Sequence, residues 1–306
     1  MHVTKLLALM FAVMLFCVSS VCMARQESAS VDVNGVQRSY RLFVPERSST
    51  TTSYPLVFDL HGTGGTPEGQ SRNSALTGLA AQHGFIVVHP VGMYVRAANS
   101  GATWNVDLDP HGIDDVEYIR AIVTSLQKRY SIDPQRIYAT GFSGGARMSS
   151  RLACDMSTTF AAVALVGGVR FPEKCSPTQP VAVLAIHAED DQVNHFEHRP
   201  DSPPYWPVGV MDAIGGWVRQ NQCDSTPRRN SLATDITKLS FERCAPGGDV
   251  VLITSKQGGH SWPGSPTLKP EIAERFHGLS ATEELWRFFA SHPKHEVRAK
   301  PRESQQ

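Results

Sequence analysis

The feature that most constrains this chain is a pentapeptide near its middle, Gly141-Phe142-Ser143-Gly144-Gly145. A run of β-forming residues, 137–140, precedes it, and a helix is expected over residues 146–154. A serine set between glycines at a strand-to-helix turn is typical of the nucleophile elbow. The sharp turn needs glycines because the backbone takes unusual angles and a neighbouring strand passes close by. The serine oxygen then stands at the positive N-terminal end of the helix.

Strands and helices alternate along the rest of the chain. Asn34-Gly35 lies between two β-rich segments, 31–33 and 38–44, and is a strong hairpin signal. Further apolar or β-rich runs cover residues 56–60, 85–88, 160–166, 181–186 and 250–255, and helices are expected over 74–82, 114–130, 210–218 and 282–290. This order predicts an α/β fold with a mostly parallel central sheet, helices on both faces and an antiparallel hairpin at its N-terminal edge.

The N-terminal residues 1–24 have the layout of a secretory signal peptide. Lys5 precedes an apolar run over residues 6–18, and small residues lead to a cleavage position after Ala24. An uncleaved membrane anchor is the alternative, because the apolar stretch is almost long enough to span a bilayer. Residues 25–292 contain no linker and are read as one catalytic domain, and the polar residues 293–306 are expected to form a frayed tail. We therefore expect a secreted or periplasmic protein without stable membrane association after cleavage.

The charge balance and the cysteines narrow the class of protein. Among 306 residues, 29 Lys and Arg balance 29 Asp and Glu, which leaves no overall field to attract nucleic acid. Removal of residues 1–24 leaves four cysteines, and an even number in an exported chain indicates disulfides. Three pairings are possible, of which the sequential one closes two short loops: Cys154 with Cys175 and Cys223 with Cys244. Zinc is disfavoured, since no two cysteines have Cys-x-x-Cys spacing.

An acid and then a histidine base follow Ser143 in the chain, which is the order that α/β-hydrolases use. His260 lies in a glycine-rich loop directly after the expected strand 250–255. Three adjacent carboxylates, Glu189, Asp190 and Asp191, follow the strand 181–186. Because catalytic groups of open parallel sheets lie at the carboxyl ends of strands, these loops are expected to meet Ser143. The residues alone leave the choice among the three acids open.

A second glycine-rich segment, His61-Gly62-Thr63-Gly64-Gly65, follows the strand that ends at Leu60. Attack on an ester places negative charge on the carbonyl oxygen, which needs preorganised N–H donors. We expect the backbone of Gly144 and the loop at Thr63 to supply this oxyanion hole. The chemistry needs no cofactor and no metal. His195 and His198, although close to the acids, are interpreted as a polar surface.

These motifs together resemble a known family, the secreted esterases grouped as polyhydroxybutyrate depolymerases and feruloyl or acetylxylan esterases. The resemblance rests on the two glycine-rich segments, Trp104-Asn105 with Ile113-Asp114-Asp115-Val116, Ile186-His187 with Asp191, and Gly258-Gly259-His260-Ser261-Trp262-Pro263-Gly264. It implies the α/β-hydrolase fold, Asp191 as the acid and the sequential disulfides. Ala188-Glu189 replaces the family's Gly-Thr before the acid, which keeps Asp190 as an alternative, and Thr63 stands where the family often has cysteine.

The expected function is a secreted serine carboxylesterase that forms an acyl-enzyme on Ser143. The alternatives are a catalytically inactive binding module and a serine peptidase on the same fold. Trp104 and Trp262, on loops near the strand ends, are expected to bind a small-molecule or oligomeric ester, with packing as the other interpretation. The sequence does not distinguish among hydroxybutyrate, feruloyl and acetylxylan esters. Without an appended polymer-binding domain, soluble or short esters are favoured over crystalline polymer.

Overall fold

The structure is a computed structural model, and it describes residues 24–46, 52–96, 98 and 100–294. The expected signal peptide lies outside the described residues except for Ala24. Of the expected tail, only Pro293 and Lys294 are described. Within the described part of the chain, none of the helices has both the length and the apolar character needed to cross a bilayer.

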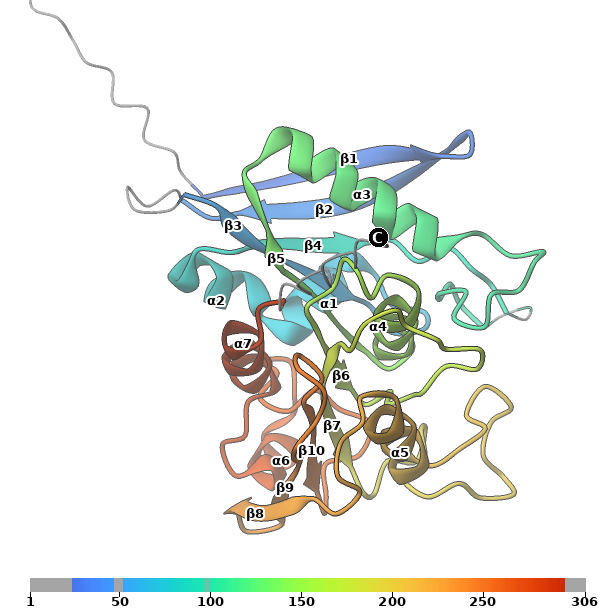
Figure 1. Cartoon of the computed structure of the whole chain (residues 1–306), viewed down its shortest axis with the longest axis vertical. Coiled ribbons are helices and arrows are strands. Elements are labelled where there is room, and N and C mark those ends of the chain that lie inside the picture. The colour runs from blue at the N-terminus through green and yellow to red at the C-terminus, as the bar shows by residue number, and fades with distance from the viewer. Residues whose placement is uncertain (1–23, 47–51, 97, 99, 295–306) are drawn as a thin grey trace, which may run out of the picture.

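The described residues form one ten-stranded sheet in the order β1-β2-β4-β3-β5-β6-β7-β10-β9-β8 (Figure 1). Its strands are β1 (Arg25–Val33), β2 (Val36–Val44), β3 (Tyr54–Leu60), β4 (Ile86–Pro90), β5 (Ile132–Phe142), β6 (Ala162–Val166), β7 (Ala182–Ala188), β8 (Arg228–Ala233), β9 (Ile236–Phe241) and β10 (Val250–Ser255). The six central strands are parallel, and an antiparallel hairpin closes each edge: β1–β2 beside β4, and β9–β8 beside β10.

Helices cover both faces of this sheet. They are α1 (Pro67–Ser74), α2 (Leu76–His83), α3 (Asp115–Arg129), α4 (Gly144–Asp155), α5 (Val210–Gln220), α6 (Pro270–Ala273), the 3₁₀ turn η1 (Glu274–Phe276) and α7 (Ala281–Ser291). One apolar cluster joins α3, α4 and α5 to one face, and a second joins α2 and α7 to the other (Figure 1). The α/β-hydrolase fold expected from the sequence is therefore confirmed.

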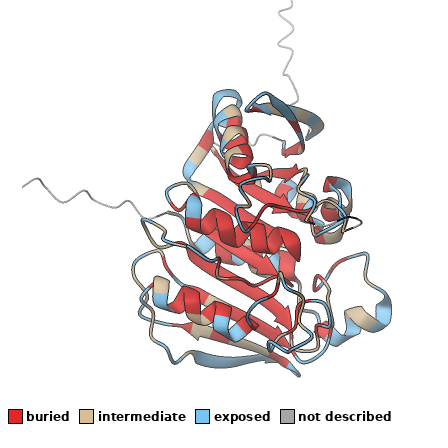
Figure 2. Cartoon of the chain, turned by 90° about the vertical axis from the view of Figure 1, so that its right-hand side faces the viewer, coloured by how far each residue is buried: buried red, intermediate tan, exposed pale blue. Residues whose placement is uncertain are grey.

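The central strands are apolar on both faces because both faces are covered. All seven residues of β3 and all five of β6 are buried, as continuous apolar runs in parallel sheets usually are. Along β3 the side chains alternate between the two clusters, with Phe58 in the first and Val57 in the second. Figure 2 shows the sheet as buried, and several of the helices as exposed on their outer faces; α4 is an exception, since it is buried from Gly144 to Cys154. This rigid centre carries the loops at the carboxyl ends of the strands.

Two parts of the fold differ from the expectation. The helix expected over 74–82 is α2 and begins later, at Leu76, because Ala75, with a φ of 52°, separates it from a preceding helix, α1, that ends at Ser74. Helix α1 has few apolar residues and was missed, although Thr66 caps Gly69 N and Pro67 opens the helix. The hairpin β8–β9 was also missed, because five of six β8 residues are exposed and show no alternation.

The C-terminal end of the described chain is held against the body. The Lys294 ammonium donates to the carbonyl oxygens of Ser157 and Phe160, at 2.5 and 3.0 Å, and its backbone N–H donates to Gln135 O at 2.8 Å. Burial lowers the pKa of Lys294 to about 8. Lys294 is therefore held by these contacts, while residues 295–306 of the expected tail lie outside the described residues.

Two disulfides link the sequential cysteine pairs, Cys154 with Cys175 and Cys223 with Cys244. Each closes a segment of 21 residues. The first joins the end of α4 to the chain after β6, and the second joins the chain after α5 to the chain after β9. Cross-links of this length stabilise by restricting the unfolded chain.

Candidate active site

Ser143 lies in the turn between β5 and α4. Its φ of 55° and ψ of −112° are unusual for a residue with a side chain, and its N–H donates to Val166 O at 2.9 Å. A Cβ added at Gly145 would come within 2.1 Å of Leu60 O, and one at Gly168 within 2.2 Å of Ser143 O. Glycine is therefore required where strand and loop pass this turn.

His260 and Asp191 meet at the carboxyl ends of β10 and β7. His260 Nδ1 lies 2.8 Å from Asp191 Oδ2. Because the carboxylate can only accept, Nδ1 donates, which leaves Nε2 of His260 as the free base. Asp191 Oδ1 also accepts from the backbone N–H groups of Val193 and Asn194, at 2.8 and 2.9 Å. These contacts hold both the carboxylate and the imidazole in place.

The carboxylate of Asp191 stays ionised although it is buried. Burial alone would raise its pKa, but the hydrogen bond and electrostatic attraction of His260, together with the hydrogen bond from the Asn194 N–H, outweigh that effect and lower it. His187 Nε2 donates to Asn194 O at 2.8 Å and lies 3.4 Å from Asp191 Oδ2. Burial lowers the pKa of His187, so this imidazole stays neutral.

The two other acids of the loop have different partners. Asp190 Oδ1 accepts from the Gly259 N–H at 2.7 Å, and so braces the loop that carries His260. Glu189 turns away, to Lys256 Nζ at 2.9 Å and Thr254 Oγ1 at 3.2 Å. Among the three adjacent acids, only Asp191 contacts the histidine in the described structure.

The glycine-rich loop after β3 lies beside the elbow. A Cβ built on Gly144 would lie 3.1 Å from Thr63 N, so the two backbones are close together. Thr63 Oγ1 and Thr103 Oγ1 lie 3.0 Å apart. His61 holds the loop in place through both ring nitrogens. Its Nδ1 donates to Gly62 O at 2.7 Å, and its Nε2 accepts from Gly92 N at 2.9 Å. Burial lowers the pKa of His61, which keeps this neutral tautomer.

A cavity of about 700 Å³ opens over these groups. Ser143, His260 and the loop 61–65 form one part of its wall. Arg147, Arg96 and Tyr205 form another. The candidate base, the serine and the loop backbone therefore face one common space, large enough for a small ester.

The two tryptophans expected to bind substrate do not line this cavity. Trp104 and Trp262 are fully buried. Trp104 Nε1 donates to His61 O at 2.8 Å, and Trp262 Nε1 donates to Thr282 Oγ1 at 3.0 Å. Both indoles support the loops that carry the site, because a buried indole N–H must find an acceptor. Neither tryptophan is therefore in a position to contact substrate in the cavity, which corrects that expectation. The other interpretation, packing, describes both residues.

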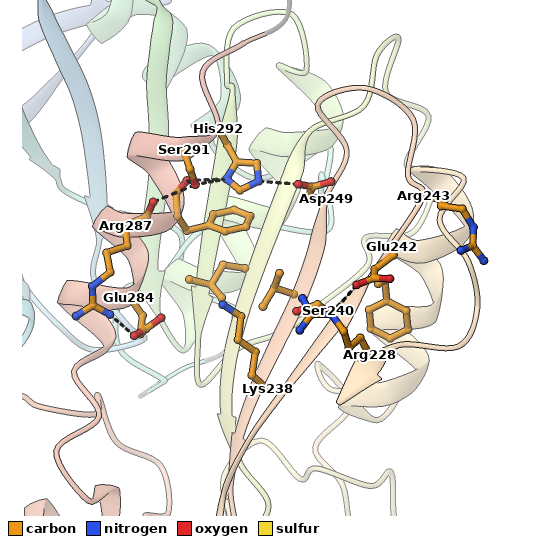
Figure 3. A pocket seen from close by; sticks show the side chains of 14 residues that line it. Arg228, Lys238, Ser240, Glu242, Arg243, Asp249, Glu284, Arg287, Ser291 and His292 are labelled. Atoms are coloured by element: carbon orange, nitrogen blue, oxygen red, sulfur yellow. Dashed lines mark hydrogen bonds and ion pairs between the residues drawn. The ribbon is translucent and has the colours of Figure 1, made fainter. Parts of the chain in front are cut away.

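A second hollow, of about 500 Å³, lies between α7 and the β8–β9–β10 end of the sheet (Figure 3). It contains none of the expected site residues. Most of its ionisable side chains contact one another: Arg228 with Glu242, Arg287 with Glu284, and His292 with Asp249. In the described part of the chain, no cluster of His, Cys, Asp or Glu is arranged to hold a metal ion.

Sequence reasoning missed Arg147, Arg96 and Asn194. Asn194 donates from Nδ2 to Gly167 O at 2.6 Å and so ties the acid loop to the segment after β6. Arg147 stands in the first turn of the helix that follows Ser143, and this closeness in the sequence is the signal that could have marked it as a candidate. Arg96 lies in an irregular loop, where no periodicity indicates direction.

The class that this fold and site define is the serine hydrolases of the α/β-hydrolase fold. The chain belongs to the Esterase PHB depolymerase family, whose model matches residues 38–214. It is 32% identical over 260 residues to the "Putative esterase NocK" of Nocardia uniformis subsp. tsuyamanensis, covering 79% of this chain and 75% of that protein. Feruloyl esterase B of Piromyces equi is 27% identical, and the match covers 68% of this chain but only 39% of that protein.

Solved structures support the same fold. The acetyl xylan esterase from Aspergillus awamori superposes with a TM-score of 0.57 and 17% identity, covering 82% of this chain and 99% of that chain. At this identity the likeness concerns the fold alone. The residues of the site are therefore interpreted from their own geometry.

Proposed function

We propose that this chain hydrolyses carboxylic esters through a covalent acyl-enzyme on Ser143. The observation that carries the proposal is the 2.8 Å contact between His260 Nδ1 and Asp191 Oδ2, in the loops that adjoin the elbow. A histidine oriented in this way can take the proton of a serine hydroxyl. The family membership agrees with the reaction class.

The proposed reaction has two halves. His260 Nε2 takes the Ser143 Oγ proton as the oxygen attacks the ester carbonyl, and Asp191 stabilises the imidazolium. The same proton then passes to the leaving alkoxide, so the alcohol departs and an acyl-serine remains. Water, deprotonated by His260, attacks this acyl group and releases the acid and the free serine. The backbone N–H groups of Gly144 and Thr63 are proposed to bind the oxyanion in both halves.

Short or soluble esters are the proposed substrates. Relatives include a feruloyl esterase and the family is named for a polyhydroxybutyrate depolymerase, so feruloyl and hydroxybutyrate esters are the first to test. The open cavity of about 700 Å³ suits an oligomer of a few hydroxybutyrate units or an ester with one aromatic acyl group. Export to the periplasm or outside the cell is proposed on the two disulfides, which persist in oxidising compartments.

The test is a labelling and kinetic experiment on Ser143→Ala. An organophosphate should label the wild type at Ser143, and the variant should take no label. Activity on p-nitrophenyl butyrate should fall by about three orders of magnitude or more, since oxyanion stabilisation alone retains little catalysis. Ser149→Ala is the matched control, because this buried serine of α4 bonds only Gly145 O in the described structure. Labelling at another serine, or an active Ser143→Ala, would reject the assignment.

The alternative function from a different class, named in the sequence analysis, is a catalytically inactive binding module. Such a module would bind ligand without turnover, so the hydrolysis of p-nitrophenyl butyrate by the wild type separates the two. The presence of Ser143, Asp191 and His260 at the three required loop positions favours the enzyme.

A further inference from the structure

One side chain of the active-site cavity is left without the partner that its chemistry needs. Arg147 is 1% exposed, and its Nε and Nη1 atoms are buried with no hydrogen-bond partner among the described residues. No described carboxylate forms an ion pair with it. A buried guanidinium without a counter-charge is costly, so proteins rarely retain one for stability alone.

The position of Arg147 directs it toward the nucleophile. Arg147 follows Ser143 by four residues, and Ser143 caps the N-terminus of α4. The Arg147 N–H donates to Ser143 O at 3.1 Å, which fixes the first turn of the helix against the nucleophile. Helical side chains also lean toward the N-terminus, which is the end that carries Ser143. Both residues line the same cavity.

The surroundings of Arg147 are positively charged. Its guanidinium carbon lies 4.3 Å from the centre of the Tyr205 ring, and that of Arg96 lies 5.0 Å from the same ring. Arg170 Nη1 donates to the Tyr205 carbonyl oxygen at 3.0 Å. The charge of Arg170 is balanced by Asp107, whose Oδ1 lies 2.6 Å from Arg170 Nη2. Arg147 and Arg96 therefore remain as an excess of positive charge at the cavity wall, oriented by one aromatic ring.

The charge of Arg147 persists at neutral pH. Burial, together with the charges of Arg96 and Arg170, lowers its pKa to about 10. The side chain is thus a desolvated cation with free donors, which is the arrangement that binds a carboxylate most strongly.

We propose that Arg147, assisted by Arg96, recognises a carboxylate on the ester substrate, so that the enzyme prefers anionic esters to neutral ones of the same length. This inference rests on the proposed ester hydrolysis at Ser143 and names its substrate class. Because Ser143 and Arg147 both line one cavity of about 700 Å³, a single small molecule can present its ester to the first and its carboxylate to the second. A hydroxybutyrate oligomer with a free acid end has this chemistry, whereas a neutral acetyl ester does not.

The experiment compares matched substrates that differ only in charge. One pair carries the group on the alcohol side: the 3-hydroxybutyrate dimer as its free acid and as its primary amide. The other carries it on the acyl side: 4-nitrophenyl hydrogen adipate and 4-nitrophenyl methyl adipate. We expect the wild-type kcat/KM for the acid to exceed that for the neutral partner about tenfold or more in at least one pair, as expected for a charged hydrogen bond.

Arg147→Gln should bring that ratio to about one, and Arg96→Gln should reduce it in part. Arg120→Gln is the control, because Arg120 lies on the exposed face of α3 and pairs with Glu117. Its ratio should equal that of the wild type. The ratio is the readout, so a general loss of activity in a variant does not affect the conclusion.

Arg147→Met separates recognition from a structural role. If Arg147 serves the substrate, replacement by an apolar side chain of similar length removes an unpaired buried charge, and the melting temperature should hold or rise. A fall in melting temperature with an unchanged substrate ratio would show a structural arginine and overturn the proposal.

The remaining outcomes are also decisive. Equal kcat/KM for acid and neutral members of both pairs in the wild type would overturn the inference while the proposed function stands. A preference for acids that survives in Arg147→Gln would reject Arg147 as its source. Absence of hydrolysis of all four esters and of p-nitrophenyl butyrate would instead reject the proposed function, and this inference with it.

Discussion

Asp190 and Asp191 are adjacent in the chain, and their carboxylates contact two adjacent residues of one loop, Gly259 and His260. Asp191 Oδ2 lies 2.8 Å from the His260 ring, whereas Asp190 Oδ1 accepts the Gly259 N–H at 2.7 Å. One acid thus orients the imidazole and the other holds the backbone beside it. The resemblance that implied Asp191 as the acid agrees with this geometry.

Asp191→Asn should therefore reduce kcat by about four orders of magnitude, because the amide no longer holds the donating tautomer of His260. Asp190→Asn should cost little, since its amide oxygen can still accept from Gly259 N. Steady-state kinetics on p-nitrophenyl butyrate measures both. If the two effects are reversed, Asp190 is the acid.

Asp190→Ala makes a separate prediction for the bracing contact. Without an acceptor for Gly259 N, the His260 loop loses one charge-assisted hydrogen bond, which is worth about 1.5–3 kcal/mol. We expect lower thermal stability and an intermediate loss of kcat. A variant that matches the wild type in both would show that the contact does not hold the loop.

Gly145→Ala should disrupt the elbow. The new Cβ would lie 2.1 Å from Leu60 O, a backbone atom of a buried strand that cannot move away. We expect a loss of about 4 kcal/mol or more of unfolding free energy, measured by urea denaturation. Gly78→Ala is the control, because nothing lies within 4 Å of a Cβ there and α2 should gain up to about 1 kcal/mol. Normal stability in Gly145→Ala would contradict the elbow geometry.

Acid should destabilise the fold through two buried histidines. Burial lowers the pKa of His61 and His187, so the unfolded chain binds more protons than the folded one below about pH 6.5. The free energy of unfolding then falls as the pH falls, with a slope of up to about 1.4 kcal/mol per pH unit for each histidine. Urea denaturation between about pH 8 and pH 5 measures this slope.

A pair of variants assigns the slope. His61→Gln should reduce the slope by the share of one histidine and leave that of His187, while His83→Gln, which changes an exposed histidine at the end of α2, should leave it as in the wild type. An unaltered slope in His61→Gln would mean that His61 is not held neutral by its two backbone contacts.

Loss of the first disulfide should lower stability and affect the site. The double variant Cys154→Ala/Cys175→Ala opens a loop of 21 residues, which the loop-entropy model values at about 3 kcal/mol. The variant Cys223→Ala/Cys244→Ala opens a loop of equal length and is the matched comparison. Because Cys154 is buried at the end of α4, whose other end holds Ser143, only the first variant should also lower kcat. Unchanged urea midpoints in both would refute the stabilising role.

The sequence predicted those elements whose pattern is local. The elbow, the Asn34-Gly35 hairpin and the strand 250–255 carry strong turn or apolar signals, and the structure has all three. The carboxyl-end rule also predicted correctly that the loops of Asp191 and His260 meet. These features needed no knowledge of distant contacts.

Features that depend on tertiary environment were not predictable. Trp104 and Trp262 sit on loops, and sequence does not tell whether a loop aromatic faces the cavity or the core. The exposed strand β8 pairs only with β9 at the sheet edge, so it shows no apolar alternation. The lack of a hydrogen-bond partner for Arg147 depends on the residues that pack around α4. Its place four residues after Ser143 does not reveal those residues.

The two hairpins at the edges of the sheet have a consequence for behaviour at high concentration. No further strand of the described residues pairs with the outer edges of β1 and β8, and open strand edges are templates for self-association into larger sheets. Both carry charged side chains along that margin, among them Arg25, Glu27, Arg228 and Arg229. Another molecule that docked its own edge there would have to desolvate those charges, so the same hairpins that complete the fold also protect it against aggregation.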